Sequence, residues 1–221
     1  MHAENMTPTE RQAVMSISSM MALRMIGLFM VLPVFTLYAQ NLSDSTPLLI
    51  GIAMGIYGLT QALCQLPFGW LSDQFGRRPL ILFGLLLFIA GSLIAAYADS
   101  IYSMMLGRAL QGMGAVGSTM LALLADLTRE NQRTKSMAIA GITIGFSFFL
   151  AMLLGPVLAK WLAVNQLFLL GAAFAAIAIG VLYSSVPNLQ HLLHNKLNQK
   201  TTTHTIYTLL STPALAKLNL G

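Results

Sequence analysis

The sequence predicts an all-α membrane protein with six transmembrane helices, and three observations lead to this fold class. Of the 221 residues, 56% are hydrophobic and 9% are charged, with a mean hydropathy of +0.72. Soluble domains carry about 25% charged residues. Apolar stretches of about 20 residues, long enough to cross the hydrocarbon core as helices, occur six times. Most basic residues fall in the short turns between these stretches.

The six predicted spans follow one another along the chain with short turns between them. The first, 14–39, follows a polar N-terminus, and its apolar run is too long for a signal-peptide core, so we expect the N-terminus to be uncleaved. The second, 47–70, ends near Gly69. The third, 79–98, opens at Pro79, where a missing N–H costs nothing. The others cover 101–125, 135–159 and 166–186. Because the turns are short, consecutive helices must run antiparallel.

The basic residues set the expected orientation. One side of the predicted bundle carries Arg11, Arg77, Arg78, Arg129, Arg133, Lys135, Lys196 and Lys200. The other side has Lys160 alone, beside Asp44 and Asp99. By the positive-inside rule, the basic side is cytoplasmic, so both termini of this multi-pass inner-membrane protein are expected in the cytoplasm. A nucleic-acid footprint needs Lys and Arg clustered on one binding face. Here they fall mostly in the short turns between apolar stretches, which is a topology signal, so a nucleic-acid partner is not expected.

Helix breakers and small residues add detail within the spans. Pro33, Pro67 and Pro156 are expected to bend or end their helices. Closely spaced glycines are expected to let helix backbones approach closely. These are Gly51 with Gly55, Gly112 with Gly117, and Gly141 with Gly145.

The turn between the second and third spans concentrates charge and helix breakers. Residues 69–81 read Gly-Trp-Leu-Ser-Asp-Gln-Phe-Gly-Arg-Arg-Pro-Leu-Ile. Gly69 is expected to let its helix end pack closely, and Gly76 to adopt a positive φ. Asp73 and Arg77 are four residues apart, so they can pair locally or reach partners on neighbouring helices. The alternative is that Arg77 serves only as a topology determinant.

Two arginines lie inside the predicted spans. Arg24 is roughly 15 Å deep at 1.5 Å per residue, and Arg108 lies in the fourth span. An intramembrane arginine costs at least about 2.5 kcal/mol, so it normally faces a polar cavity or a partner. The alternative is snorkelling to the interface, for which Arg108 is the better candidate. Further polar or small residues are expected to line the same mostly apolar cavity: Tyr57, Gln61, Gln111 and Gly112.

The sequence carries no enzyme constellation. All four histidines (His2, His191, His194 and His204) lie outside the predicted spans, and no nucleophile-elbow, phosphate-binding or zinc-protease motif occurs. The single cysteine, Cys64, rules out an internal disulfide. We therefore expect a transported or bound ligand rather than a reaction, with no metal and no organic cofactor.

Three segments of the sequence resemble motifs of a known family. Residues 69–81 resemble motif A of the major facilitator superfamily, G-x-L-x-D-x-x-G-R-[RK]-x-x-[LI], at Gly69, Leu71, Asp73, Gly76, Arg77 and Arg78. Residues 106–112 resemble motif B, whose arginine, here Arg108, the family associates with proton coupling. Gly155 and Pro156 resemble the core of the antiporter motif C, with Ala151 and Ala159 departing from it.

Segments 19–33, 51–67 and 125–135 resemble the YajR-type branch of drug:proton antiporters. By this resemblance Asp73, Arg77 and Asp126 form a charge relay that locks the outward-facing state. The resemblance implies one six-helix half of a twelve-helix fold that binds its substrate between two halves. It also implies efflux of drugs or other small molecules, with the proton gradient in place of a cofactor. The implied partners are the lipid bilayer, the substrate and protons.

The segment after the sixth span leaves three interpretations open. Residues 187–205 predict a cytoplasmic amphipathic linker, and 206–221 resemble the cut-off start of a second half. The chain is then a truncated or split half that needs a separately encoded C-terminal half. Alternatively it is a six-helix unit that acts as a homodimer, or a non-transporting membrane assembly subunit. Arg24 argues against the assembly subunit, because a pure scaffold has no need of buried charge.

Overall fold

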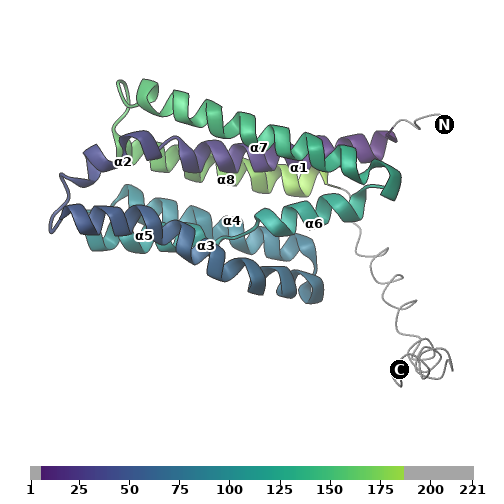
Figure 1. The fold of residues 1–221 in the computed structure, drawn as a ribbon, viewed down its shortest axis with the longest axis horizontal. Coiled ribbons are helices and arrows are strands. Elements are labelled where there is room, and N and C mark those ends of the chain that lie inside the picture. The colour runs from purple at the N-terminus through teal and green to yellow at the C-terminus, as the bar shows by residue number, and fades with distance from the viewer. Residues whose placement is uncertain (1–5, 187–221) are drawn as a thin grey trace, which may run out of the picture. The chain divides into compact units, whose positions relative to one another are not determined.

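The computed structural model describes residues 6–186, which form eight helices making up six membrane spans (Figure 1). The helices are α1 (Pro8–Phe29), α2 (Leu32–Ala39), α3 (Pro47–Phe75), α4 (Arg77–Ala96), α5 (Ile101–Met113), α6 (Gly117–Leu127), α7 (Glu130–Leu158) and α8 (Val164–Ser185). The first span comprises α1 and α2, and the fourth comprises α5 and α6. The six predicted spans are confirmed. The predicted linker and second-half segments, 187–205 and 206–221, lie outside the described residues.

Several helices run beyond the predicted apolar stretches at one end of the bundle, where α1, α4 and α7 begin. This basic end carries Arg11, Arg77, Arg78, Arg129, Arg133 and Lys135. There α1 begins at Pro8, α3 continues to Phe75 and α7 begins at Glu130. A capping box explains the early start of α1. The Thr7 hydroxyl accepts from the Glu10 N–H at 3.2 Å, and the Glu10 carboxylate accepts from the Thr7 N–H at 2.9 Å. Hydropathy does not detect a polar cap of this kind, so the predicted span began several residues later than the helix does.

Two spans are interrupted within the membrane. The first breaks at Met30 and Val31, directly before Pro33 in the first turn of α2. Pro33 has no N–H, so the carbonyl four residues earlier loses its helical donor, as predicted. The fourth span breaks between α5 and α6 at residues 114–116, which the sequence did not predict. Pro67 and Pro156 lie inside α3 and α7 without ending them. Membrane helices tolerate such prolines where the freed backbone groups find other partners.

The helices pack as two groups joined by α4 and α8. Figure 1 shows α1, α7 and α8 together and α3, α4 and α5 together, and each group is tightly packed. The outer helices are the least buried: 17% of the apolar window of α3 or α7 is buried, against 50% for α4. Most of the apolar surface of α3 and α7 therefore remains open for lipid or another protein segment.

Glycines do mediate close helix approaches, but mostly not the predicted ones. A Cβ at Gly112 would overlap the Tyr57 carbonyl and the Thr60 hydroxyl, so this prediction is confirmed. A Cβ would meet nothing within 4 Å at the other predicted positions: Gly51, Gly55, Gly117, Gly141 and Gly145. Those predictions were wrong, because spacing along a helix does not reveal which face meets a neighbour. Close crossings that the sequence did not predict pair two glycines at a time, Gly27 with Gly171, and Gly91 with Gly107.

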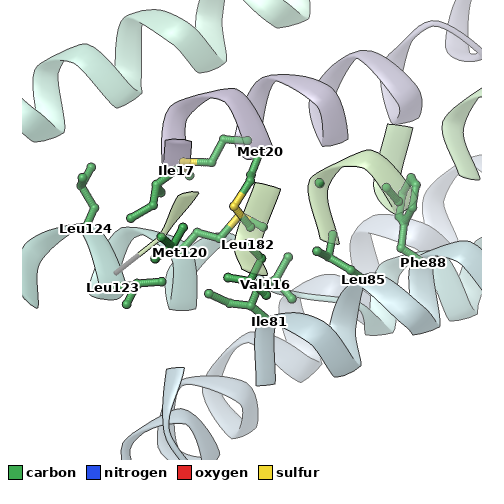
Figure 2. Close-up of a cluster of buried hydrophobic side chains, with 14 of the residues drawn as sticks. Ile17, Met20, Ile81, Leu85, Phe88, Val116, Met120, Leu123, Leu124 and Leu182 are labelled. Carbon is green, nitrogen blue, oxygen red and sulfur yellow. The ribbon is translucent and has the colours of Figure 1, made fainter. Parts of the chain in front are cut away.

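The apolar core is divided into two clusters along the membrane normal. Figure 2 shows the cluster nearer the basic end, where side chains of α1, α4, α6 and α8 converge. Its labelled members include Ile17, Met20, Ile81, Leu85, Met120, Leu123 and Leu182. The second cluster is built around Phe35, Ile101, Met104 and Phe168. Along the fourth span, Arg108 and Gln111 fall between residues of the two clusters.

Candidate functional site

Arg24 is buried in the bundle and connects three spans. Its side chain is 2% exposed, and Nη2 donates to the Tyr57 hydroxyl at 3.4 Å and to the Gly114 carbonyl at 3.2 Å. Its guanidinium carbon lies 5.9 Å from the centre of the Phe88 ring. Gly114 caps the C-terminal end of α5, where the helix dipole favours a cation. The unpredicted break in the fourth span thus supplies a carbonyl partner for Arg24.

Arg108 is equally buried, at 1% exposure. Its Nη1 donates to Gln111 Oε1 at 3.0 Å, and Gln111 Nε2 donates to Ser92 Oγ at 2.8 Å. The guanidinium carbon lies 5.6 Å from the Phe35 ring centre and 5.1 Å from that of Tyr57, within the range of cation–π attraction. Snorkelling, the alternative for Arg108, is wrong because the side chain does not reach solvent.

Both arginines contact Tyr57, and the carboxylates of the described residues neutralise the charge of neither. Arg24 bonds the Tyr57 hydroxyl and Arg108 lies over the Tyr57 ring. Within residues 6–186 neither guanidinium pairs with a carboxylate, and the Nε of each is buried without a hydrogen-bond partner. We call Arg24, Tyr57, Arg108 and Gln111 the arginine cluster. It holds two positive charges that protein carboxylates in this part of the chain do not neutralise.

Small and hydroxyl residues hold the helices of the arginine cluster together. Gly112 lets α5 approach the Tyr57 backbone on α3. Thr60 Oγ1 donates to the Ala109 carbonyl at 3.0 Å, which joins the same two helices. Gln61 is half-buried and takes no part in the hydrogen bonds of the cluster, and its predicted place in the lining of a cavity stays a prediction. Thr60 and Ser92 were missed because hydroxyl residues are common in membrane helices.

Gly155 and Pro156 lie where α7 crosses the break in the first span. A Cβ at Gly155 would overlap the Met30 carbonyl oxygen and lie 3.0 Å from the carbonyl carbon. Ala151, one turn earlier on α7, is completely buried. Gly155 therefore forms the contact between α7 and the junction of α1 and α2, whereas Pro156 is exposed.

The turn at residues 69–81 forms an ion network around Arg77. Arg77 Nη2 lies 2.6 Å from Asp73 Oδ1, and Arg77 Nε lies 3.3 Å from Asp126 Oδ2 at the end of α6. Arg77 Nη1 also donates to Ser72 Oγ, and that hydroxyl donates to the Gly69 carbonyl at 2.7 Å. The proximity of Asp73, Arg77 and Asp126 is as predicted, and Ser72 is an additional member.

Three other residues of this turn, Gly69, Gly76 and Arg78, differ in whether the structure agrees with their predicted roles. Gly76 has φ +93°, which confirms the predicted positive φ. A Cβ at Gly69 would meet nothing within 4 Å, so its predicted close packing is wrong. Arg78 is half-buried and its Nε has no hydrogen-bond partner, so the geometry does not join Arg78 to the network. Gly69 lies on the open face of α3, which explains why the described helices leave it without a close neighbour.

A second ion pair at the basic end was missed by the sequence reasoning. Glu10 is 5% exposed and accepts from the backbone N–H of Arg129 at 2.9 Å. The Arg129 side chain adds bonds from Nε at 3.0 Å and Nη2 at 3.2 Å. This fork joins the first turn of α1 to the residue that precedes α7. No local sequence pattern signals it, because Glu10 and Arg129 are 119 residues apart, and the capping box Thr7-x-x-Glu10 predicts only the bonds between Thr7 and Glu10.

Comparison with known families identifies the fold. Residues 15–218 match the model of the Major Facilitator Superfamily. The chain belongs to this superfamily. Its proteins are membrane transporters, so a transport protein rather than an enzyme is the correct class, and the bundle is one half of the superfamily fold.

Individual relatives agree with this assignment. The chain is 47% identical over 222 residues to the inner membrane transport protein YajR of Escherichia coli, covering 100% of this chain and 48% of the relative. It is 30% identical over 135 residues to the class B tetracycline resistance protein of Escherichia coli, covering 60% of this chain and 33% of the relative. The human organic anion transporter MFSD10 has a similar fold, with a TM-score of 0.68 at 21% identity, over 82% of this chain and 48% of that chain.

The chain therefore spans about half the length of the relative that it matches from end to end. It corresponds to the N-terminal half of YajR-like transporters, and it is a multi-pass membrane protein. In a superfamily transporter the substrate binds between two such halves. The arginine cluster lies inside the bundle, and the Arg77 network and the Glu10–Arg129 fork lie at its basic end.

Proposed function

We propose that this chain is the N-terminal half of a proton-coupled efflux antiporter, which works together with a second six-helix half. The observation that carries the proposal is the arginine cluster. A membrane bundle that served only as a scaffold would gain nothing from two buried guanidiniums, each of which costs at least about 2.5 kcal/mol to place in the membrane. Similarity to a tetracycline resistance protein supports a drug-like or other small-molecule substrate. The homodimer and assembly-subunit alternatives gain no comparable support.

The arginine cluster supplies fixed positive charge rather than a mobile proton. A guanidinium stays protonated at all physiological pH values, so neither Arg24 nor Arg108 can carry the coupled proton. A nearby cation instead favours the deprotonated form of an acid. The carboxylates of residues 6–186 all lie towards the ends of the spans: Glu10, Asp44, Asp73, Asp99, Asp126 and Glu130. We infer that the proton-carrying acid comes from the second half or from the substrate.

The Arg77 network is proposed to act as the conformational latch. It connects the end of α3, the start of α4 and the end of α6 through one side chain. The positive-inside rule supports placing this basic end, and with it both termini, in the cytoplasm of a cell with an inner membrane. A proton or voltage change that weakens the network would free α3 and α4 to move relative to α6.

The proposed transport activity can be tested with two separate halves. Co-expression of this chain with the C-terminal half of a YajR-like transporter is expected to lower the accumulation of a lipophilic cation in energised cells. Either half alone should have no effect, because the substrate site lies between the halves. Collapse of the proton gradient should abolish the difference. Equal accumulation with and without the pair of halves, both shown to be in the membrane, would contradict the proposal.

Asp73→Asn is expected to impair transport by the two-half system while leaving membrane insertion and stability nearly unchanged. Asp73 is 64% exposed, so its ion pair with Arg77 contributes at most about 1 kcal/mol to stability. Its role in the latch does not depend on that contribution. Transport and the melting temperature of purified protein should be measured together. Asp44→Asn makes the same change at the opposite end and should transport normally. Wild-type transport by Asp73→Asn would reduce this network to packing and topology.

A further inference from the structure

An open hollow lies between α1 and α7 at the basic end, away from the arginine cluster and the Arg77 network. Its volume is about 460 Å³, and it is lined by Met6, Arg11, Val14, Met15, Lys135 and Ile139. A second hollow of about 470 Å³ shares Met6, Arg11 and Met15, and adds Pro8 and Gln12. Sites for small ligands typically have volumes of roughly 300–1,000 Å³. The space is therefore large enough for part of an amphipathic molecule.

Charge and apolar surface are separated along this hollow. Arg11 on α1 and Lys135 on α7 provide two cations from different helices. Val14 and Met15 follow Arg11 by three and four residues, and Ile139 follows Lys135 by four, so each lies about one turn further along the same helix face. Arg11 and Lys135 are thus nearer the outer end of the hollow than Val14, Met15 and Ile139, and Met6, which precedes α1, completes the apolar lining.

The two cations of this hollow have no carboxylate partners in the described part of the chain. Among the described residues, ion pairs join Arg77 to Asp73 and Asp126, and Arg129 to Glu10. Glu10 is the carboxylate nearest to Arg11 in sequence, and the fork to Arg129 already occupies it. Arg11 and Lys135 are both exposed. Their positive charge is therefore available to an external anion.

The length of the helices places the cations at headgroup depth. The first span has 32 residues and α7 has 29, which correspond to roughly 48 and 43 Å at 1.5 Å per residue. The hydrocarbon core is about 30 Å thick, and about 40–45 Å with the headgroups. Arg11 is the fourth residue of α1 and Lys135 the sixth of α7. Arg11 therefore lies in the headgroup layer and Lys135 near its boundary with the hydrocarbon core, and Val14, Met15 and Ile139 lie one turn nearer the acyl chains.

We propose that this hollow binds one anionic phospholipid. Its phosphate lies between Arg11 and Lys135, and an acyl chain covers Val14, Met15 and Ile139. Basic hollows between transmembrane helices are suited to anionic headgroups. The apolar lining favours a lipid over a free phosphate, because most of the residues around the hollow have no polar group for a soluble anion. Such a lipid contacts α1 and α7 at once and braces the two helices against each other.

Lipid retention by the purified full chain tests the proposal. Native mass spectrometry should compare phosphatidylglycerol with phosphatidylcholine of the same acyl chains, and we expect at least a fivefold preference for the anionic lipid. Arg11→Gln combined with Lys135→Gln should remove this preference, and Arg11→Lys combined with Lys135→Arg should keep it. Arg133→Gln combined with Lys160→Gln removes the same charge from exposed positions outside the hollow and serves as the matched control.

Three results would overturn the proposal. The first is an absence of preference for phosphatidylglycerol in the wild-type chain. The second is an equal loss in the matched control, which would indicate diffuse surface charge. The third is displacement of the lipid by glycerol phosphate at equal concentration, which would indicate a simple anion site. Melting temperatures without added lipid check the folding of each variant. Should the double variant fail to fold, Arg11→Gln alone should lose at least half of the preference, and full retention by it would contradict the proposal.

Discussion

Gly155→Ala is expected to lower the stability of the six-helix bundle by about 1–3 kcal/mol, the usual cost of overpacking a well-packed interior. The added methyl group would overlap the Met30 carbonyl oxygen and lie 3.0 Å from the carbonyl carbon. This obstacle is main chain, so it cannot be relieved by rotating a side chain. Relief requires α7 to move away from the junction of α1 and α2. That movement would also disturb Ala151, which is completely buried one turn away.

The same helix provides a matched control for this substitution. Gly145 lies ten residues earlier on α7, and a Cβ there would meet nothing within 4 Å. Alanine is a better helix former than glycine by about 1 kcal/mol, so Gly145→Ala should be neutral or stabilising. Thermal unfolding of the purified variants in one detergent gives the comparison. Equal melting temperatures for the two variants would show that the crossing at Gly155 tolerates a side chain.

These two glycines also show what the sequence could and could not predict. Gly145 and Gly155 both lie in the apolar span formed by α7. Gly141 and Gly145 have the spacing typical of helix contacts, yet a Cβ at either position would meet nothing within 4 Å. Gly155 makes the close crossing, and its partner Met30 is 125 residues away in the sequence. Which face of a helix meets which neighbour depends on the packing of the whole bundle. A single sequence carries no direct signal for it.

Features governed by local physics were predictable. Hydrophobic length predicted six spans, because lipid requires about 20 apolar residues per crossing. The i, i+4 spacing predicted the contact of Asp73 with Arg77, whereas the contact of Arg77 with Asp126 was predicted by the resemblance to the family. The break at residues 114–116 was not predicted, and neither was the hydrogen bond that its Gly114 carbonyl accepts from Arg24, 90 residues earlier in the sequence.

Arg108→Met is expected to reduce transport by the two-half system roughly tenfold or more, a loss of at least about 1.4 kcal/mol in the rate-limiting step. The substitution removes the positive charge from the arginine cluster and keeps a long, flexible side chain. If the cluster serves to favour a deprotonated acid on the second half or on the substrate, removal of the charge eliminates that effect. The remaining guanidinium, that of Arg24, donates to the hydroxyl of Tyr57, whereas Gln111 accepts from Arg108.

Stability should respond much less than transport to Arg108→Met. The variant loses the charged hydrogen bond to Gln111, worth about 1.5–3 kcal/mol. It also removes a buried charge with an unpaired Nε, whose replacement by an apolar side chain is often neutral or stabilising by about 1–4 kcal/mol. The two contributions oppose each other and are of similar size. We therefore expect a melting temperature close to that of the wild-type chain.

One further variant separates charge from shape at Arg108, and a variant at another site serves as its control. Arg108→Lys keeps the charge but loses the planar guanidinium that lies over Phe35 and Tyr57, so it should retain partial transport. Lys160→Met makes a similar change at an exposed site near the opposite end and should transport normally. If Arg108 has only a structural role, transport by Arg108→Met will fall in proportion to the amount of folded protein. Lost transport with unchanged folding would instead assign the role of Arg108 to its charge.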